Sequence, residues 1–109
     1  MPRVAKKKEF TEFINNGVVF SPATPAIGDK LKVTYNGLLS KSGATDVIAH
    51  FGYGNKWEQK KDIRMNKTLS GFETTIPIEM PANKLNFCFK DAANNWDNNS
   101  GKNYSINLM

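Results

Sequence analysis

The stretch FCFKDAANNWDNNSGKNY, residues 87–104, is the part of the chain around which the rest is organised. It begins as a strand, because the aromatic residues Phe87 and Phe89 alternate with more polar positions. A long polar segment rich in Asn follows, and the apolar alternation returns at Tyr104 and Ile106. The pattern therefore predicts two strands that flank a polar loop.

One aromatic residue, Trp96, lies in the middle of this polar loop. A loop of this composition is soluble without an aromatic side chain, so two explanations are open. Trp96 either folds back to cap the core or offers a flat apolar face to a ligand. Sugar rings suit the second explanation, because they present C–H groups on one face and hydroxyl groups that pair with Asn and Asp at the rim.

The remaining chain alternates between short strand patterns and turn signals. A small helical pattern is predicted near Phe10, Phe13 and Ile14, with an extended arm as the alternative, and Leu38-Leu39 is predicted to be an edge or loop. Strands are predicted at residues 18–20, 30–35, 46–53, 57–65, 72–79, 85–90 and 104–108. About seven short strands with regular turns indicate an all-β fold, an antiparallel β-sandwich.

Composition fits one small domain, in which residues 1–17 are a basic arm or short helix and residues 18–109 are the folded module. The net charge is +5, but four of the 15 basic residues lie within residues 1–9. The body of the domain is thus close to electrically balanced, which argues against nucleic-acid binding. The single cysteine, Cys88, forms no disulfide within the chain and is expected to be an inert thiol on or near the sheet.

Two further residues stand out near the middle of the chain. His50 alternates out of phase with the apolar residues of its strand, so it is expected to face solvent. Trp57 lies just past the turn at Gly52 and Gly54, which break the strand. A single histidine on a strand is commonly an ordinary surface residue, but two tryptophans in turns beside it favour a ligand site.

Catalysis and cofactor binding have little support in the sequence. There is one histidine, no Gly-x-Ser-x-Gly motif and no recognisable pair of carboxylates for acid and base chemistry. The segment from Asp91 to Gly101 resembles a calcium loop but fails the EF-hand pattern, because Ala93 occupies a ligand position and the bidentate Glu is missing. We therefore expect no enzyme activity, no cofactor and no metal.

Two blocks carry a family resemblance: VIAHFGYGNKW at residues 47–57 and FCFKDAANNWDNNSGKNYSI at residues 87–106. Together with the linking GFETTIPIEMPANKL, they resemble carbohydrate-binding module family 25, the starch-binding modules of bacterial amylases, or a closely related starch-binding family. The resemblance covers residues 18–108. It implies an immunoglobulin-like β-sandwich that binds α-1,4-linked glucose chains.

The resemblance also implies which residues bind the sugar. A histidine and two tryptophans form the family's platform, and these match His50, Trp57 and Trp96; amides of the Asn-rich loop point to Asn98 and Asn99. The chain departs from the family where Ile48-Ala49 precede His50, since a more aromatic strand is common there. This departure puts additional sugar contacts from that strand in doubt.

The expected partner is therefore an α-glucan polysaccharide or maltooligosaccharide, bound by a monomer without catalysis. The resemblance allows a covalently linked amylase domain in a longer parent protein. The module would be extracellular if it belongs to a secreted amylase, and cytoplasmic if this chain, which shows no signal peptide, is the whole gene product. No run of 18 apolar residues is present, so no membrane partner is expected.

Two alternatives stay open. The first is a small β domain that binds single-stranded nucleic acid through exposed aromatic and basic residues. The second is a purely structural β-sandwich in which Trp57 and Trp96 are buried against the core.

Overall fold

The computed structural model describes residues 13–109, and residues 1–12 lie outside the described residues. The first sheet has the strand order β1-β2-β3-β7-β6 and the second the order β10-β8-β4-β5, with β9 pairing to β8. The first sheet comprises β1 (Phe13–Asn15), β2 (Val18–Ser21), β3 (Lys30–Tyr35), β6 (Asn66–Thr68) and β7 (Gly71–Pro77). The second comprises β4 (Val47–Tyr53), β5 (Glu58–Arg64), β8 (Lys84–Asp91), β9 (Trp96–Asp97) and β10 (Tyr104–Asn107).

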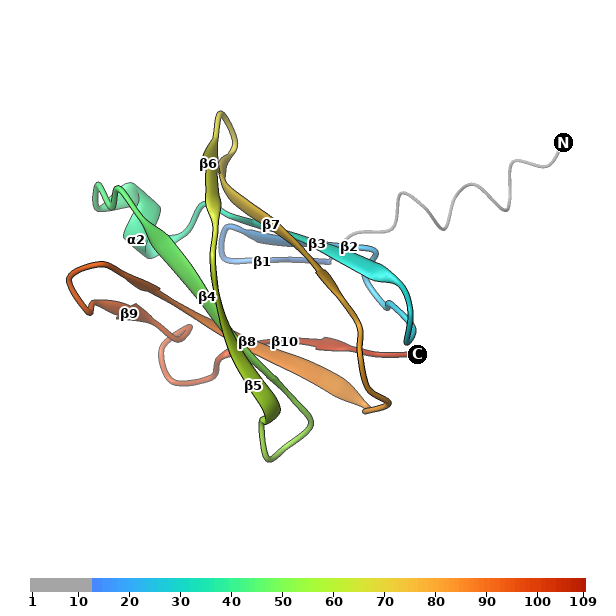
Figure 1. Cartoon of the computed structure of the whole chain (residues 1–109). Coiled ribbons are helices and arrows are strands. Elements are labelled where there is room, and N and C mark those ends of the chain that lie inside the picture. The colour runs from blue at the N-terminus through green and yellow to red at the C-terminus, as the bar shows by residue number, and fades with distance from the viewer. Residues whose placement is uncertain (1–12) are drawn as a thin grey trace, which may run out of the picture.

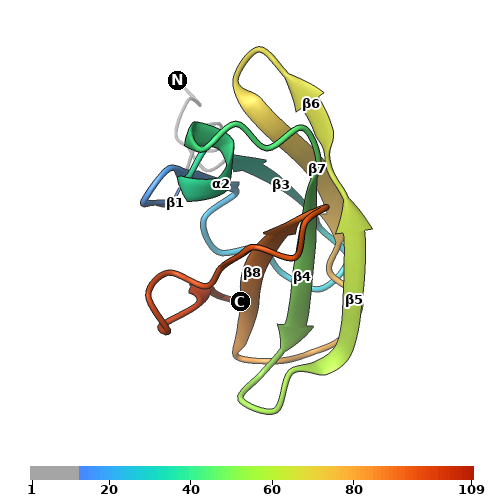
Figure 2. The ribbon, with the colours of Figure 1, turned by 90° about the vertical axis from the view of Figure 1, so that its left-hand side faces the viewer.

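The two sheets pack face to face, as Figures 1 and 2 show. All the strand pairs are antiparallel, which confirms the predicted all-β antiparallel sandwich. The seven longer strands are the predicted ones. The additional strands β1, β6 and β9 have only two or three residues each, too few for a periodic pattern to be recognised.

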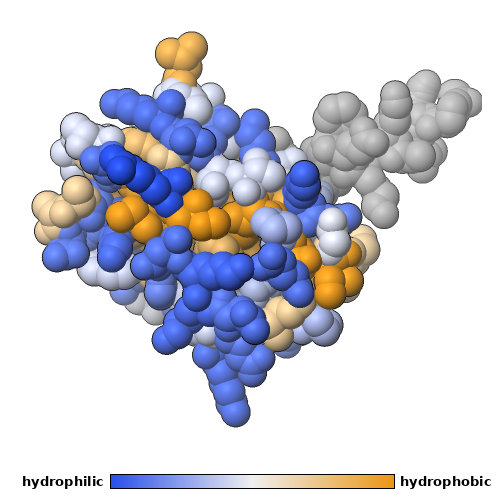
Figure 3. Space-filling view, in the orientation of Figure 1, coloured by the Kyte–Doolittle hydropathy of each residue, from blue (hydrophilic) through white to orange (hydrophobic). Residues whose placement is uncertain are grey.

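The core lies between the sheets and is built from the alternating apolar residues of both. Phe20 of the first sheet lies 5.1 Å from Phe87 of the second, and Tyr35 lies 4.4 Å from Phe89, measured between ring centroids. The space-filling view shows the apolar side chains as a band between hydrophilic surfaces (Figure 3). The residues predicted to face inward on β3, β4 and β8 all belong to the core cluster, which confirms these predictions. On β8 the outward-facing Asn86 and Cys88 are buried as well.

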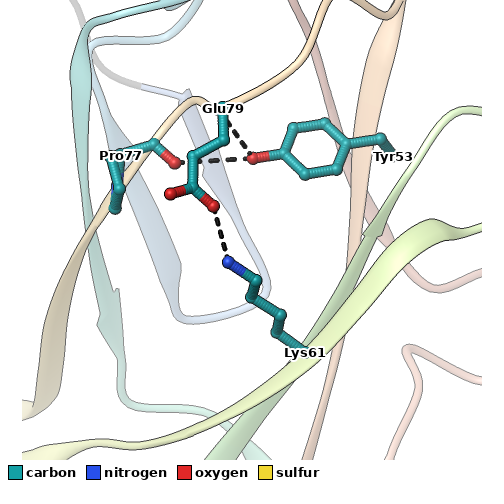
Figure 4. Close-up of polar contacts among 4 residues, drawn as sticks. All are labelled: Tyr53, Lys61, Pro77 and Glu79. Carbon is teal, nitrogen blue, oxygen red and sulfur yellow. Dashed lines mark hydrogen bonds and ion pairs between the residues drawn. The ribbon is translucent and has the colours of Figure 1, made fainter.

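Polar contacts also connect the two sheets. The Tyr53 hydroxyl donates a hydrogen bond to the Pro77 carbonyl at 3.4 Å and accepts one from the Glu79 N–H at 3.1 Å. Lys61 on β5 reaches the same Glu79 through its ammonium group, 2.5 Å from Oε1 (Figure 4). Because both side chains of this ion pair are about half exposed, the pair adds little stability. The Tyr53 side chain is buried, and its two hydrogen bonds align the sheets.

The structure differs from the sequence prediction at two places. The helical pattern is wrong at Phe13–Asn15, which form strand β1 and pair with β2; Phe10 lies outside the described residues. Leu38–Lys41, predicted to be an edge or loop, form the short helix α2. The Leu39 N–H donates to the hydroxyl of Tyr35, four residues earlier, at 2.9 Å. With only four residues, α2 is too short for a helical period to be recognised in the sequence. No helix among residues 13–109 is long and apolar enough to cross a membrane.

Candidate functional site

The candidate site lies on the outer face of the second sheet. His50 on β4 pairs with Cys88 on β8 and with Asp62 on β5, so the three side chains project from the same face. The His50 Nδ1 is hydrogen-bonded to Asp62 Oδ1. With the carboxylate as acceptor, Nδ1 carries the proton, and the ring is held in a fixed orientation. His50 thus faces outward, as predicted, with its side chain about one quarter exposed.

Trp57 is placed beside His50 by the turn that joins β4 to β5. Its backbone passes directly over Gly52, where an added Cβ would lie only 2.8 Å from the Trp57 Cα. The turn is held by the Asn86 amide, which donates to the Gly54 carbonyl at 2.8 Å. The imidazole of His50 and the indole of Trp57 are stacked, with centroids 5.5 Å apart and planes inclined by 23°.

Trp96, on the short strand β9, also approaches His50. It pairs with Lys90 of β8, whose Nζ lies 5.3 Å from the centroid of the indole ring, a cation–π contact. The indole is edge-on to the His50 ring, with centroids 5.8 Å apart and planes inclined by 85°. Trp96 is 46% exposed and outside the buried core cluster, so the core-capping alternative is wrong.

We call His50, Trp57 and Trp96 the aromatic platform. The imidazole lies between the two indoles, nearly parallel to Trp57 and nearly perpendicular to Trp96. The two indole planes therefore stand at a large angle to each other. Neither tryptophan belongs to the hydrophobic core, so the alternative in which both are buried structural residues is wrong as well.

The platform forms part of an open hollow with a volume of about 590 Å³, here called the main hollow. Its other lining residues are Lys56, Lys60, Cys88, Asn98 and Asn103. The side-chain carbonyl of Asn98 accepts from the Gly101 N–H at 2.9 Å, and the Asn98 amide N–H groups have no hydrogen-bond partner within residues 13–109. Lys56, Lys60 and Asn103 are not predicted from the sequence as site residues. Lys56 and Asn103 lie in or beside turns, and Lys60 lies on β5 just after the turn that carries Trp57.

Asn99, the other predicted sugar-binding amide, is not brought into the main hollow. Its Nδ2 donates to the Asn103 carbonyl at 3.0 Å, and its Oδ1 accepts from the Asn16 amide at 2.6 Å. Both ends of the Asn99 side chain are therefore engaged in holding the loop to itself and to the turn between β1 and β2.

A buried carboxylate anchors the segment that carries Trp96. Asp97 is 5% exposed and accepts hydrogen bonds from the Tyr35 hydroxyl at 2.6 Å and from the Tyr104 hydroxyl at 3.0 Å. Burial and these bonds to Asp97 raise the pKa values of both tyrosines above the ordinary range, so both hydroxyls remain donors. The network fixes Trp96 on one side of the second sheet while Asp97 points inward. The sequence does not indicate that Asp97 is buried, because it lies among the polar residues of an Asn-rich loop.

Asp91 holds the start of the loop through hydrogen bonds from loop residues to its carboxylate. Its Oδ2 accepts from the Asn95 side-chain amide at 2.9 Å, and its Oδ1 accepts from the N–H groups of Ala93 and Asn95. The side-chain hydrogen bond from Asn95, and then its backbone bond, lower the pKa of Asp91. Within residues 13–109, no group of three or more His, Cys, Asp or Glu side chains is arranged to hold a metal ion.

Cys88 lies in the main hollow beneath the platform and is almost completely buried. Burial raises the pKa of its thiol to about 11, so the thiol is protonated and a weak nucleophile at neutral pH.

Comparison with known proteins identifies the family. Residues 31–87, just over half of the chain, match the family model described as "Starch/carbohydrate-binding module (family 53)". The chain belongs to carbohydrate-binding module family 53. The matched residues include His50 and Trp57 and end before Trp96. This family 53 module is thus a starch-binding module, as predicted, while the more specific assignment to family 25 is not confirmed.

A curated relative supports the same class. The module is 38% identical over 81 residues to an α-amylase of Clostridium acetobutylicum, an alignment that covers 73% of this chain and 10% of the amylase. The chain therefore spans about a tenth of the length of this relative. No solved structure matches the chain.

Proposed function

We propose that this family 53 module binds α-1,4-linked glucan chains without catalysis, with His50, Trp57 and Trp96 as the contact surface. The observation that carries the proposal is the aromatic platform itself, in which three rings converge on one open hollow. Trp96 is half exposed and is held by the buried Asp97 network, and Trp57 is held by the turn between β4 and β5, so both are ready to bind without rearrangement. This limits the ordering cost that weakens binding by flexible loops.

Polar groups beside the rings supply the directional contacts. In this proposal, the free amide of Asn98 and the side chain of Asn103 hydrogen-bond the glucose hydroxyls, and Lys56 and Lys60 donate from the rim. Asn99 acts indirectly, since its amide holds the loop. The sugar contact that the sequence predicted for Asn99 is therefore assigned to Asn103, which lines the main hollow.

The expected affinity follows from the stacking area. One stacked sugar ring hides on the order of 80 Å² of apolar surface, equivalent to about 2 kcal/mol. Two such rings and a few hydrogen bonds, less the cost of association, leave roughly −4 to −7 kcal/mol. The dissociation constant should therefore lie between micromolar and millimolar.

The angle between the indoles supports selectivity for curved chains. A chain of α-1,4-linked glucose turns continuously, so successive rings can meet two faces that stand at a large angle. A flat β-1,4-linked chain such as cellulose presents successive rings in one plane and can stack on only one of these indoles.

The lining of the main hollow supports a non-catalytic role. Glycosidases generally place two carboxylates on either side of the scissile bond. None of the described residues that line the main hollow is Asp or Glu, and the nearby Asp62 is hydrogen-bonded to His50. Pure protein should therefore release no reducing sugar from starch. We further propose that the module, within residues 18–109, acts as a monomer and can be linked to an amylase domain in a longer protein, as its relative suggests.

Affinity electrophoresis tests the proposal. We expect soluble starch and glycogen to retard the native protein, and carboxymethyl cellulose and xylan to leave its migration unchanged. The matched control is the variant Leu69→Ala, which changes a fully exposed residue on the β6–β7 turn and should be retarded like the native protein. Equal migration of the native protein in all gels would refute the glucan assignment.

Single-stranded nucleic acid is the second candidate ligand. Lys56 and Lys60 line the main hollow and Lys90 packs on Trp96, so cations and exposed rings occur together. Binding of an oligonucleotide that weakens steeply between about 50 and 200 mM salt would favour this alternative. Glucan binding that barely responds to the same change would favour the proposed function.

A further inference from the structure

Trp96 separates the main hollow from a second one, which the proposed function does not use. The second hollow is open, has a volume of about 370 Å³, and shares Trp96 and Asn98 with the main hollow. The residues that distinguish it are Asn16, Leu38, Asn99 and Ser100. It therefore begins where the aromatic platform ends.

The walls of the second hollow come from both sheets. Helix α2 lies against β9. Asn16, in the turn between β1 and β2, donates to Asn99 Oδ1 and so ties the first sheet to the loop. The floor contains Asp97 and Tyr104, which are buried and hydrogen-bonded to each other. The hollow is therefore a firmly held surface.

Its chemistry repeats that of a sugar site on a smaller scale. Leu38 is 60% exposed and offers an apolar surface at the start of α2. The hydroxyl of Ser100 and the side-chain carbonyl of Asn16 have no hydrogen-bond partner within residues 13–109. Both can therefore pair with ligand hydroxyls. A single exposed leucine is ordinary, but here it faces a hollow that continues from an aromatic platform.

From this continuity we infer that the second hollow is an extension subsite for the same glucan chain. The inference rests on the proposed function. A glucan stacked on Trp96 continues past the edge of the indole, and its next glucose units reach Leu38 and Ser100. The module should therefore bind a long chain more tightly than a trisaccharide, because only the long chain fills both hollows.

The test compares maltotriose with maltoheptaose by calorimetric titration. The variants are Leu38→Ser and Ser100→Gly; the glycine removes the hydroxyl and accepts the φ of +58° at this position. The control is Leu69→Ser, which makes the same change at a fully exposed leucine distant in the sequence from either hollow. Thermal unfolding should be nearly unchanged in all three, since the altered side chains are exposed.

We expect Leu38→Ser to weaken maltoheptaose binding about fivefold, from the loss of some 40 Å² of apolar contact. Ser100→Gly should weaken it about threefold, while maltotriose binding by both variants, and both affinities of Leu69→Ser, should match the native protein. Unchanged maltoheptaose affinity in both variants, or an equal loss for the two sugars, would overturn the extension subsite while leaving the proposed function intact. Absence of binding of either sugar to the native protein would refute both.

Discussion

Replacing Trp96 by alanine separates ligand binding from folding. The indole is 46% exposed, and it contacts the imidazole of His50 and the ammonium group of Lys90. Both of these residues lie on the outer face of the second sheet. Removing the indole leaves a shallow depression open to water and no closed cavity. The free energy of unfolding should therefore fall by about 2–3 kcal/mol, from roughly half of the area that a core tryptophan buries. A core tryptophan would instead lose about 3–5 kcal/mol.

The same substitution should have a large effect on glucan binding. The exposed half of the indole is the surface that a sugar ring covers, and losing about 80 Å² of stacking corresponds to about 2 kcal/mol. The affinity for maltoheptaose should fall roughly thirtyfold. Trp96→Phe is the matched control, because it keeps a flat face, and its affinity should lie between those of the native protein and the alanine variant.

Two measurements on each variant determine its stability and its affinity for glucan. Urea unfolding gives the free energy of unfolding, and calorimetric titration of maltoheptaose gives the affinity. The reasoning would be refuted if Trp96→Ala strongly lowered the urea midpoint while the folded fraction bound glucan with native affinity. That outcome would make Trp96 a structural residue.

Two substitutions test how the platform is held, and the labelling of Cys88 tests the lining of the main hollow. Gly52→Ala places a Cβ 2.8 Å from the Trp57 backbone, so the turn must shift; we expect about tenfold weaker glucan binding, and native affinity would contradict this account. Asp97→Asn leaves one acceptor oxygen for two tyrosine hydroxyls and buries an unpaired amide, so urea unfolding should report a loss of about 2–4 kcal/mol. A change below about 1 kcal/mol would show that the network is unimportant. Cys88, whose pKa is raised to about 11, should react slowly with iodoacetamide at pH 8 and more slowly with maltoheptaose bound; rapid labelling unaffected by the sugar would contradict its place in the main hollow.

Much of the fold follows from local patterns in the sequence. The alternation of Leu85, Phe87 and Phe89 correctly predicts the inward face of β8, and the out-of-phase position of His50 correctly predicts its outward direction. These predictions succeed because a strand has a period of two, so that one buried face determines the other.

The remaining features depend on contacts between distant segments. The Trp96 segment is held by a bond from Tyr35 to Asp97, 62 residues further along the chain, and the two sheets are joined by the bond from Tyr53 to the Pro77 carbonyl, 24 residues away. No local pattern contains either contact.

The roles of the loop amides also escape prediction from the sequence. Asn99 and Asn103 both have positive φ values, and the turns they form direct one side chain into the loop and the other into the main hollow. Composition predicts an amide-rich site, while backbone geometry decides which amides are available.

The central claim, that glucan binds on the aromatic platform, is tested most directly by nuclear magnetic resonance of the two indole N–H groups. The chain has only two tryptophans, so Trp57 and Trp96 give two indole signals. On titration with maltoheptaose, both should shift saturably with the same dissociation constant, together with the side-chain amides of Asn98 and Asn103. The Leu69 backbone amide should not move. Indole signals that stay fixed while glucan binds, or that move no more than Leu69, would contradict the assignment of the site.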